Sequence, residues 1–336
     1  IGFDMDHTLV EYHTEAFENL VHQESLKKLV NDLNYPKELL NLKFDARRVI
    51  QGLGGGVGVS VSRGLSRQIF SEKQLNVSLS FINIAFAIAP AIAPLVGTLI
   101  GESFGVSSIF YFVLVMGVFA LLLLFSVSTT LKQYMPTTSE NVFSDTLALI
   151  KTTMMKIVSV GMASGLLYGI VFSFITAAPS MVMEQFGLSK TMFSIYSLFA
   201  TLSFVLGSVM NILLIDTPVL QKFRLSSLFI FVLSLVFWVL TVPLHVNALA
   251  IVLGFSYIVF FFIGIAMPCS VTIILGFSGT SAGFLAALTG FFHLTGAAIG
   301  AYAVTLLNME PTASFAYTTS ALSLASILIC LSLKKH

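Results

Sequence analysis

The sequence predicts an all-α membrane protein, a helical bundle with eight complete spans and one partial span, preceded by a short α/β segment. Three observations support this fold class. Hydrophobic residues make up 56% of the 336 residues, charged residues make up 10%, and the mean hydropathy is +0.94. Of the 33 Asp, Glu, Lys and Arg residues, 15 lie in the first 48 positions. Residues 225–309 contain none of these four types, so the chain has too little polar surface for a soluble enzyme of this length.

The first element is a polar segment, residues 1–47, which opens with IGFDMDHTLVEY. An apolar run before the pattern D-x-D-x-T resembles the first motif of haloacid-dehalogenase-type (HAD) phosphatases, and the residues up to about Ala46 resemble cytosolic purine 5'-nucleotidases. The resemblance implies that Asp4 is a nucleophile, that Asp6 is a general acid and base, and that both bind Mg²⁺. A segment of about 45 residues cannot bury a core of its own. We therefore expect no catalysis from it.

A partial span follows at residues 49–62, which are 14 uncharged residues bounded by Arg48 and Arg63. They make about 21 Å of helix, whereas the apolar core of a bilayer is about 30 Å thick. Lengthening the segment in either direction would draw arginines toward the membrane centre, which is unfavourable.

Eight uncharged runs long enough to cross a bilayer come next, since a spanning helix needs about 20 apolar residues. They are residues 77–101, 106–131, 157–183, 191–215, 225–244, 248–275, 283–307 and 314–333. A polar linker at residues 132–156 separates the first two runs, in segment 48–131, from the last six, in segment 157–333. We expect this linker to be cytoplasmic.

Basic residues between the runs predict the orientation, because short loops rich in Lys and Arg stay in the cytoplasm. Ten lie in alternate connections and at the C-terminus: Arg63, Arg67, Lys73, Lys132, Lys151, Lys156, Lys222, Arg224, Lys334 and Lys335. The other loops hold only Lys190. The sequence therefore predicts a multi-pass protein of the cell (inner) membrane with a cytoplasmic C-terminus, and we expect the N-terminal segment to be cytoplasmic too.

Four strings in the apolar part resemble major facilitator drug:proton antiporters, most closely the bicyclomycin-resistance (Bcr/CflA) branch. RVIQGLGGGVGVSVSRGLSRQIF (48–70) resembles the family's fourth span and the loop after it, and FAIAPAIAPLVGTLIG (86–101) resembles the fifth-span antiporter motif. FSFITAAPSMVMEQFGLS (172–189) and GTSAGFLAALTGFFHLTGAAIGA (279–301) resemble the seventh and eleventh spans. The two resemblances overlap near residues 50–53, which favours a fusion of two truncated frames.

The transporter resemblance implies proton-driven export of small amphipathic drugs by alternating access in a lipid bilayer, with no cofactor and no nucleic-acid partner. Because the match begins at the family's fourth span, we expect spans one to three to be absent and coupled transport to be impaired. Two alternatives stay open: a Mg²⁺-dependent nucleotidase fragment, and an inactive fusion remnant.

Candidate transport residues follow from the motifs. Pro90 and Pro94 should bend their helix, since proline removes a backbone hydrogen bond; the bend either shapes a gate or is merely tolerated. Gly97 belongs to a set of glycines four residues apart that lets helices approach closely, either for packing or as a rocking surface. The set comprises Gly97 and Gly101, Gly161, Gly165 and Gly169, and Gly296 and Gly300. Arg48 matches the fourth-span arginine of the family, or else reaches the lipid headgroups.

Polar side chains inside the apolar runs are candidates for lining a substrate cavity. Asn211, Tyr257 and His293 are the transport candidates of this kind, because buried cavities in bundles take their specificity from a few polar groups. His293 can either hydrogen-bond a facing helix or take up a proton during transport.

Overall fold

The structure is a computed structural model that describes residues 46–132, 142–246, 248–277, 282–307 and 309–332. Contacts within the chain define two compact units, Ile1–Gly58 and Val59–His336. Of the first unit, the structure describes only residues 46–58, the beginning of helix α3 (Ala46–Ile69). The α/β segment predicted at residues 1–47 lies almost wholly outside the described residues.

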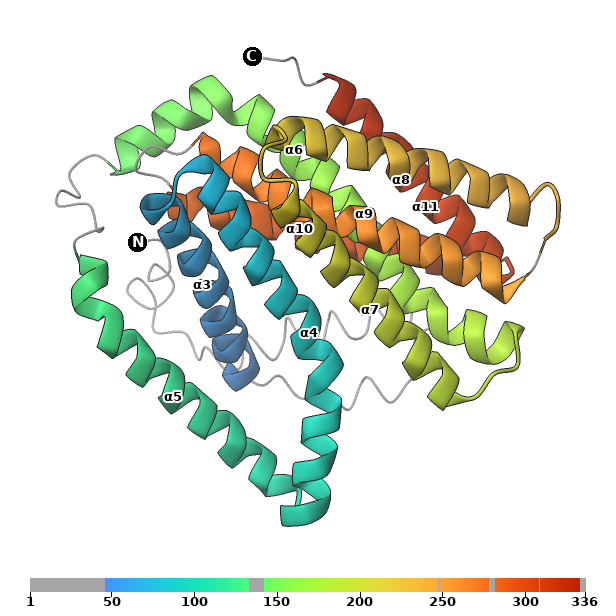
Figure 1. The fold of residues 1–336 in the computed structure, drawn as a ribbon, viewed down its shortest axis with the longest axis horizontal. Coiled ribbons are helices and arrows are strands. Elements are labelled where there is room, and N and C mark those ends of the chain that lie inside the picture. The colour runs from blue at the N-terminus through green and yellow to red at the C-terminus, as the bar shows by residue number, and fades with distance from the viewer. Residues whose placement is uncertain (1–45, 133–141, 247, 278–281, 308, 333–336) are drawn as a thin grey trace, which may run out of the picture. The chain divides into compact units, whose positions relative to one another are not determined.

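The described residues of the second unit are helical, as the sequence predicts (Figure 1). Each of the eight apolar runs falls on a helix: α4 (Glu72–Phe104), α5 (Val106–Lys132), α6 (Val142–Pro179) with the π-helix η2 (Ser180–Gln185), α7 (Lys190–Leu213), α8 (Val219–Thr241), α9 (Leu249–Gly276), α10 (Ala282–Leu306) and α11 (Pro311–Ser332). Within the part of the chain that the structure describes, six of them, from α6 to α11, are long and apolar enough to cross a membrane. Helices suit such residues because every backbone polar group is then satisfied within its own segment.

Local sequence explains where several helices begin and end. Pro179 has no N–H to donate, and the helix beyond it widens into η2, where Phe186 N donates to Met181 O at 3.1 Å. The side chain of Ser189 accepts a hydrogen bond from Met192 N and so caps α7. Pro311 is the first residue of α11, a position where the missing N–H leaves no intrahelical bond unmade.

Helix α3 is longer than its 14-residue apolar segment. It has 24 residues, about 36 Å at 1.5 Å per residue, and includes Arg63 and Arg67. Arg63 is buried, and Arg67 Nε donates to Leu275 O at the end of α9 at 2.9 Å. Both arginines therefore lie on a helix and not in the predicted loop, and Arg67 contacts the end of α9. The side of the membrane that they face stays a prediction.

The linker region is also partly helical. Helix α6 begins at Val142 and includes Lys151 and Lys156, while residues 133–141 lie outside the description. Likewise, α8 begins at Val219, six residues before the predicted run, and includes Lys222 and Arg224.

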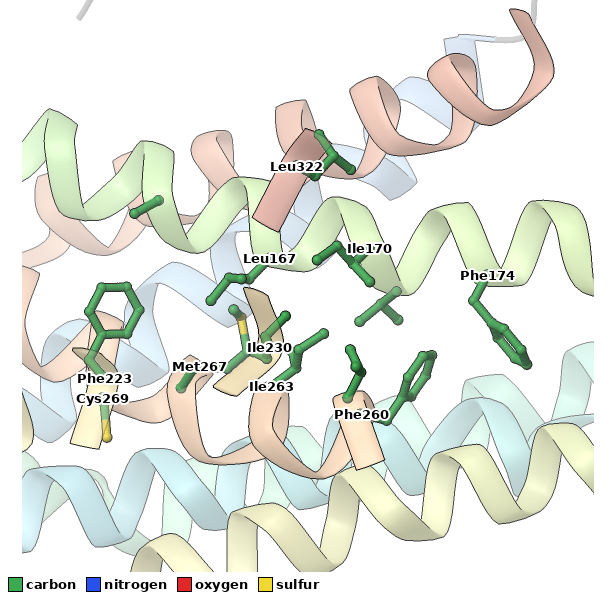
Figure 2. Packing of buried hydrophobic residues seen from close by; sticks show 14 of the residues in the cluster. Leu167, Ile170, Phe174, Phe223, Ile230, Phe260, Ile263, Met267, Cys269 and Leu322 are labelled. Carbon is green, nitrogen blue, oxygen red and sulfur yellow. The ribbon is translucent and has the colours of Figure 1, made fainter. Parts of the chain in front are cut away.

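The hydrophobic core lies among α6, α8, α9, α10 and α11, with α4 and α7 packed beside α9. Figure 2 shows Leu167 and Ile170 of α6 pointing toward Ile263 and Met267 of α9. Phe237 of α8 and Phe255 of α9 stack in the same core, with ring centroids 4.1 Å apart. By contrast, every residue of Tyr111–Ser126 in α5 is exposed, and α5 runs apart from these helices in Figure 1.

Glycines bring α6 and α10 into close contact, as their four-residue spacing predicts. A Cβ atom on Gly296 would lie 1.8 Å from Gly165 O, and one on Gly300 would lie 2.0 Å from Gly169 O. No side chain fits at such distances, so this helix pair depends on backbone-to-backbone packing.

Candidate functional site

Several candidate residues fall where the structure describes no side chain. Asp4 and Asp6, the predicted nucleotidase and Mg²⁺ residues, lie outside the described residues, and Arg48 is described only as part of α3. Pro90, Pro94 and Gly97 are likewise described only as part of α4. Helix α4 continues without interruption through both prolines, and its axis changes direction part way along (Figure 1). A gating role for this bend stays a prediction.

Asn211 lies in a buried polar cluster near the C-terminal end of α7. Its Nδ2 donates to Asn76 Oδ1 at 2.7 Å and to Ser80 Oγ at 2.9 Å, both on α4. Its Oδ1 accepts from the thiol of Cys269 on α9 at 3.3 Å. The side chain is fully buried, so Asn211 joins α7 to two other helices.

Lys222 belongs to the same cluster, although the sequence analysis placed it in a loop. It is the fourth residue of α8, and its side chain is only 4% exposed. Its Nζ donates to Asn76 Oδ1 and to Asn211 O, each at 3.2 Å. Asn76 Nδ2 in turn donates to Thr272 Oγ1 on α9 at 3.0 Å. Four helices therefore meet at these polar groups.

Asn76, Thr272 and the role of Lys222 were not predicted from the sequence. One signal was available: Asn76, Ser80 and Asn83 lie on one face of a helix, at spacings of four and three residues, and all three are buried. Polar residues repeated along one face of an apolar helix indicate that this face contacts protein and not lipid.

His293 lies on α10 and is buried. Its Nε2 lies 3.2 Å from Ser164 Oγ on α6, and its ring centroid lies 5.4 Å from that of Tyr168, also on α6. This is the contact with a facing helix that the sequence analysis considered. Uptake of a proton by His293 stays a prediction.

Tyr257 lies on α9, twelve residues before Cys269, which is about 18 Å along a helix. Its ring centroid lies 6.3 Å from that of Phe199 on α7, and its buried hydroxyl has no hydrogen-bond partner within the described residues. The structure therefore places Asn211 and Tyr257 at different levels of the bundle, and His293 against α6. A shared cavity lined by the three stays a prediction.

An ion pair lies beside the polar cluster, at the exposed edge of the same helix ends. Lys73 Nζ, in the first turn of α4, donates to Asp216 Oδ1 at 2.7 Å; Asp216 lies between α7 and α8. The hydrogen bond from Lys73 and the nearby positive charge lower the pKa of the Asp216 carboxyl. Both side chains are largely exposed to solvent.

A groove of about 500 Å³ opens next to this pair. Its lining is mostly apolar: Phe70, Gln74, Val77, Ser78, Phe81, Ile82 and Ile215. None of these is a predicted site residue. Within the described residues, no three His, Cys, Asp or Glu side chains are grouped so that they could hold a metal ion.

Comparisons with known proteins agree with this architecture. Residues 1–56 match the 5' nucleotidase family. The chain is 24% identical over 218 residues to a protein of Haemophilus influenzae named "Bicyclomycin resistance protein homolog"; the match covers 64% of this chain and 54% of that protein, so the chain spans about half the length of this relative. Residues 46–301 match the Major Facilitator Superfamily, and the overlap at residues 46–56 falls where the two sequence resemblances meet. With more than half of its length covered, this multi-pass membrane chain belongs to the Major Facilitator Superfamily.

Proposed function

We propose that this chain exports small amphipathic, drug-like molecules across the cell (inner) membrane by alternating access, in exchange for protons. The observation that supports it most is the contrast between two kinds of helix contact. Helices α6 and α10 meet through backbone contacts at glycines. Helix α4 contacts α7, α8 and α9 through hydrogen bonds and the Lys73–Asp216 ion pair, besides its buried Leu75 and Leu79. Because water can replace the polar contacts, we expect this interface to separate more readily than the interface of α6 and α10.

Such a separation is what alternating access requires of a major facilitator protein, in which two helical groups rock about a central site. Membership of the family and the drug-resistance name of the relative support a small-molecule substrate. Lipid would surround the apolar helices. Roles for Arg48, Pro90, Pro94, Gly97, Tyr257 and His293 in this cycle are part of the proposal.

The orientation belongs to the proposal as well. Arg67, Lys73 and Lys222 lie at the helix ends that meet around the polar cluster. The end of α11 lies there too, because Cys330 Sγ is 3.6 Å from Ser227 Oγ of α8. By the distribution of positive charge, this end faces the cytoplasm, and with it the C-terminus.

A drug-susceptibility assay tests the export proposal. Cells that express the chain should tolerate higher concentrations of bicyclomycin or other small amphipathic drugs than cells with an empty vector, at equal growth in drug-free medium. A protonophore should remove the difference, since export would lose its driving force. Unchanged susceptibility, with the chain detected in the membrane fraction, would contradict export by this chain.

A second candidate is a Mg²⁺-dependent purine 5'-nucleotidase activity, which the match of residues 1–56 favours. Purified chain incubated with inosine monophosphate and Mg²⁺ should then release phosphate. The release should disappear in Asp4→Asn, because an amide cannot act as the nucleophile. Equal phosphate release by both proteins would exclude Asp4 as the nucleophile.

A further inference from the structure

The buried amino group of Lys222 has only neutral partners among the described residues. We use the name Lys222 cluster for Asn76, Ser80, Asn211, Lys222, Cys269 and Thr272. Its two hydrogen-bond acceptors are Asn76 Oδ1 and Asn211 O, and no carboxylate of the described residues pairs with it. A buried ammonium is unfavourable unless hydrogen bonds compensate for the lost water.

The position of Lys222 within α8 adds to this unfavourable placement. It lies in the first turn of the helix, where free backbone N–H groups and the helix dipole favour negative charge. A lysine placed there gains nothing from its own helix. What stabilises it must come from the neighbouring helices, and its hydrogen bonds go to two amide oxygens there.

One of these oxygens belongs to α4. Asn76 Oδ1 accepts from Lys222 Nζ at 3.2 Å and from Asn211 Nδ2 at 2.7 Å, while Asn76 Nδ2 donates to Thr272 Oγ1 at 3.0 Å. A single amide of α4 therefore contacts α7, α8 and α9. If α4 moved away, the Lys222 ammonium would lose one of its two acceptors and would require water in its place.

We propose that Asn76 and Lys222 are positioning residues of the transport cycle: the Asn76 amide holds α4 against α7, α8 and α9, and the buried Lys222 makes release of that amide coincide with entry of water at this end. The inference rests on the proposed transport function for its role. The contact between Asn76 and Lys222 does not depend on the proposed function, because it can be measured without transport.

Cys269 provides a native reporter. It is fully buried, bonds to Asn211 and lies within the cluster; Figure 2 shows it among the buried residues of the hydrophobic core. The chain has two cysteines, and Cys330→Ser keeps a hydroxyl where the thiol meets Ser227. In the full-length Cys330→Ser chain in lipid nanodiscs, the rate of maleimide labelling then reports exposure of Cys269.

Four variants in that background test the proposal, each compared with its own rate after unfolding in detergent. Asn76→Ala should label at least about tenfold faster, because the buried ammonium loses an acceptor. The double variant Asn76→Ala with Lys222→Met should label within about threefold of Lys222→Met alone, since coupled residues give non-additive effects. Asn76→Asp keeps an acceptor for Lys222 and should stay near the parent rate. A merely structural role for Asn76 would not be rescued by removal of the lysine.

Asn83→Ala is the matched control. Asn83 lies on the same helix face as Asn76 and is buried, but its Nδ2 has no partner within the described residues. Labelling of Asn76→Ala no faster than that of Asn83→Ala would overturn the proposal, as would a double variant that labels as fast as Asn76→Ala.

If Asn76→Ala does not fold, Asn76→Asp and Lys222→Met still test the proposal. Both variants should elute from a size-exclusion column like the parent and should label at the parent rate. Fast labelling of Asn76→Asp would overturn the role of the acceptor. Lost drug resistance with this labelling pattern intact would contradict the proposed function alone.

Discussion

At the scale of single residues, the placement of charge distinguishes the two lysines near the start of α4 and of α8. Lys73 is exposed and pairs with the exposed Asp216, an arrangement that contributes little because water screens both groups. Lys222 is buried and has neutral acceptors, so loss of an acceptor would leave a buried ammonium without compensation. We therefore expect the buried lysine, and not the exposed ion pair, to be the stronger constraint on this helix end.

The Lys73–Asp216 pair predicts a pH dependence. The folded chain lowers the pKa of Asp216 below its usual 3.8. The stabilisation from the ionised pair is therefore complete above the unfolded pKa and is lost as the pH falls through the folded one. A carboxyl titration of Asp216 by NMR should show a lower midpoint in the parent than in Lys73→Ala. Equal midpoints would mean that Lys73 does not hold the carboxylate in solution.

At the scale of helices, the pair formed by α6 and α10 has little tolerance for added volume. Phe292 O lies 2.4 Å from the place of a Cβ on Gly165, and Gly296 O lies 2.6 Å from that on Gly169. The backbone atoms in the way cannot turn aside as a flexible side chain could. Any side chain at these glycines must push the two helices apart.

Gly300→Ala should therefore destabilise the chain by about 1–3 kcal/mol, the usual effect of overpacking. Gly290→Ala is the matched control on the same helix, since nothing lies within 4 Å of its Cβ position; alanine there should be neutral or stabilising, because it favours helix over glycine. Unfolding in a graded mixture of denaturing and mild detergent, followed by circular dichroism, measures both. Equal stability of the two variants would show that α6 and α10 are not in close contact.

Helix ends show how local sequence and packing combine. The π-helix after Pro179 carries Gln185, whose Oε1 accepts hydrogen bonds from Thr312 N at 3.2 Å and Thr312 Oγ1 at 2.7 Å, at the start of α11. Pro179 removes one backbone donor at the point where α6 changes into η2, which favours the change there. The contact of Gln185 with α11 cannot be predicted from local sequence, because Thr312 is 127 residues away in the chain.

At the scale of the molecule, the surface of the second unit is that of a membrane protein. Large apolar side chains are exposed on many helices, among them Phe125 at 71%, Leu294 at 68% and Leu331 at 69%. Buried positions, in contrast, include many Ser and Thr residues whose hydroxyls bond to backbone carbonyls of their own helix. Lipid is the solvent that suits such a surface, because it does not penalise exposed hydrocarbon.

Features of the fold that depend on contiguous residues could be predicted from the sequence, and contacts between distant segments of the chain could not. All eight apolar runs were predicted and lie on helices, because the thickness of a bilayer fixes the length of a span. The contact of Gly165 and Gly169 with α10 agrees with their spacing. The burial of Arg63 and Lys222 was not predicted, since charge between two apolar runs favours a loop in contact with water.

The amino-acid sequence by itself determined the membrane character, the order of the apolar runs that form helices, and the family, because hydropathy and motifs are properties of contiguous residues. Only the tertiary structure decided that Asn76, Asn211, Lys222 and Thr272 meet at one place, that His293 contacts Ser164, and that Tyr257 lies apart. Those contacts join helices between 11 and 196 residues apart in the chain. Which polar groups share a buried position depends on how helices rotate and pack against each other, and no pattern along one helix encodes that.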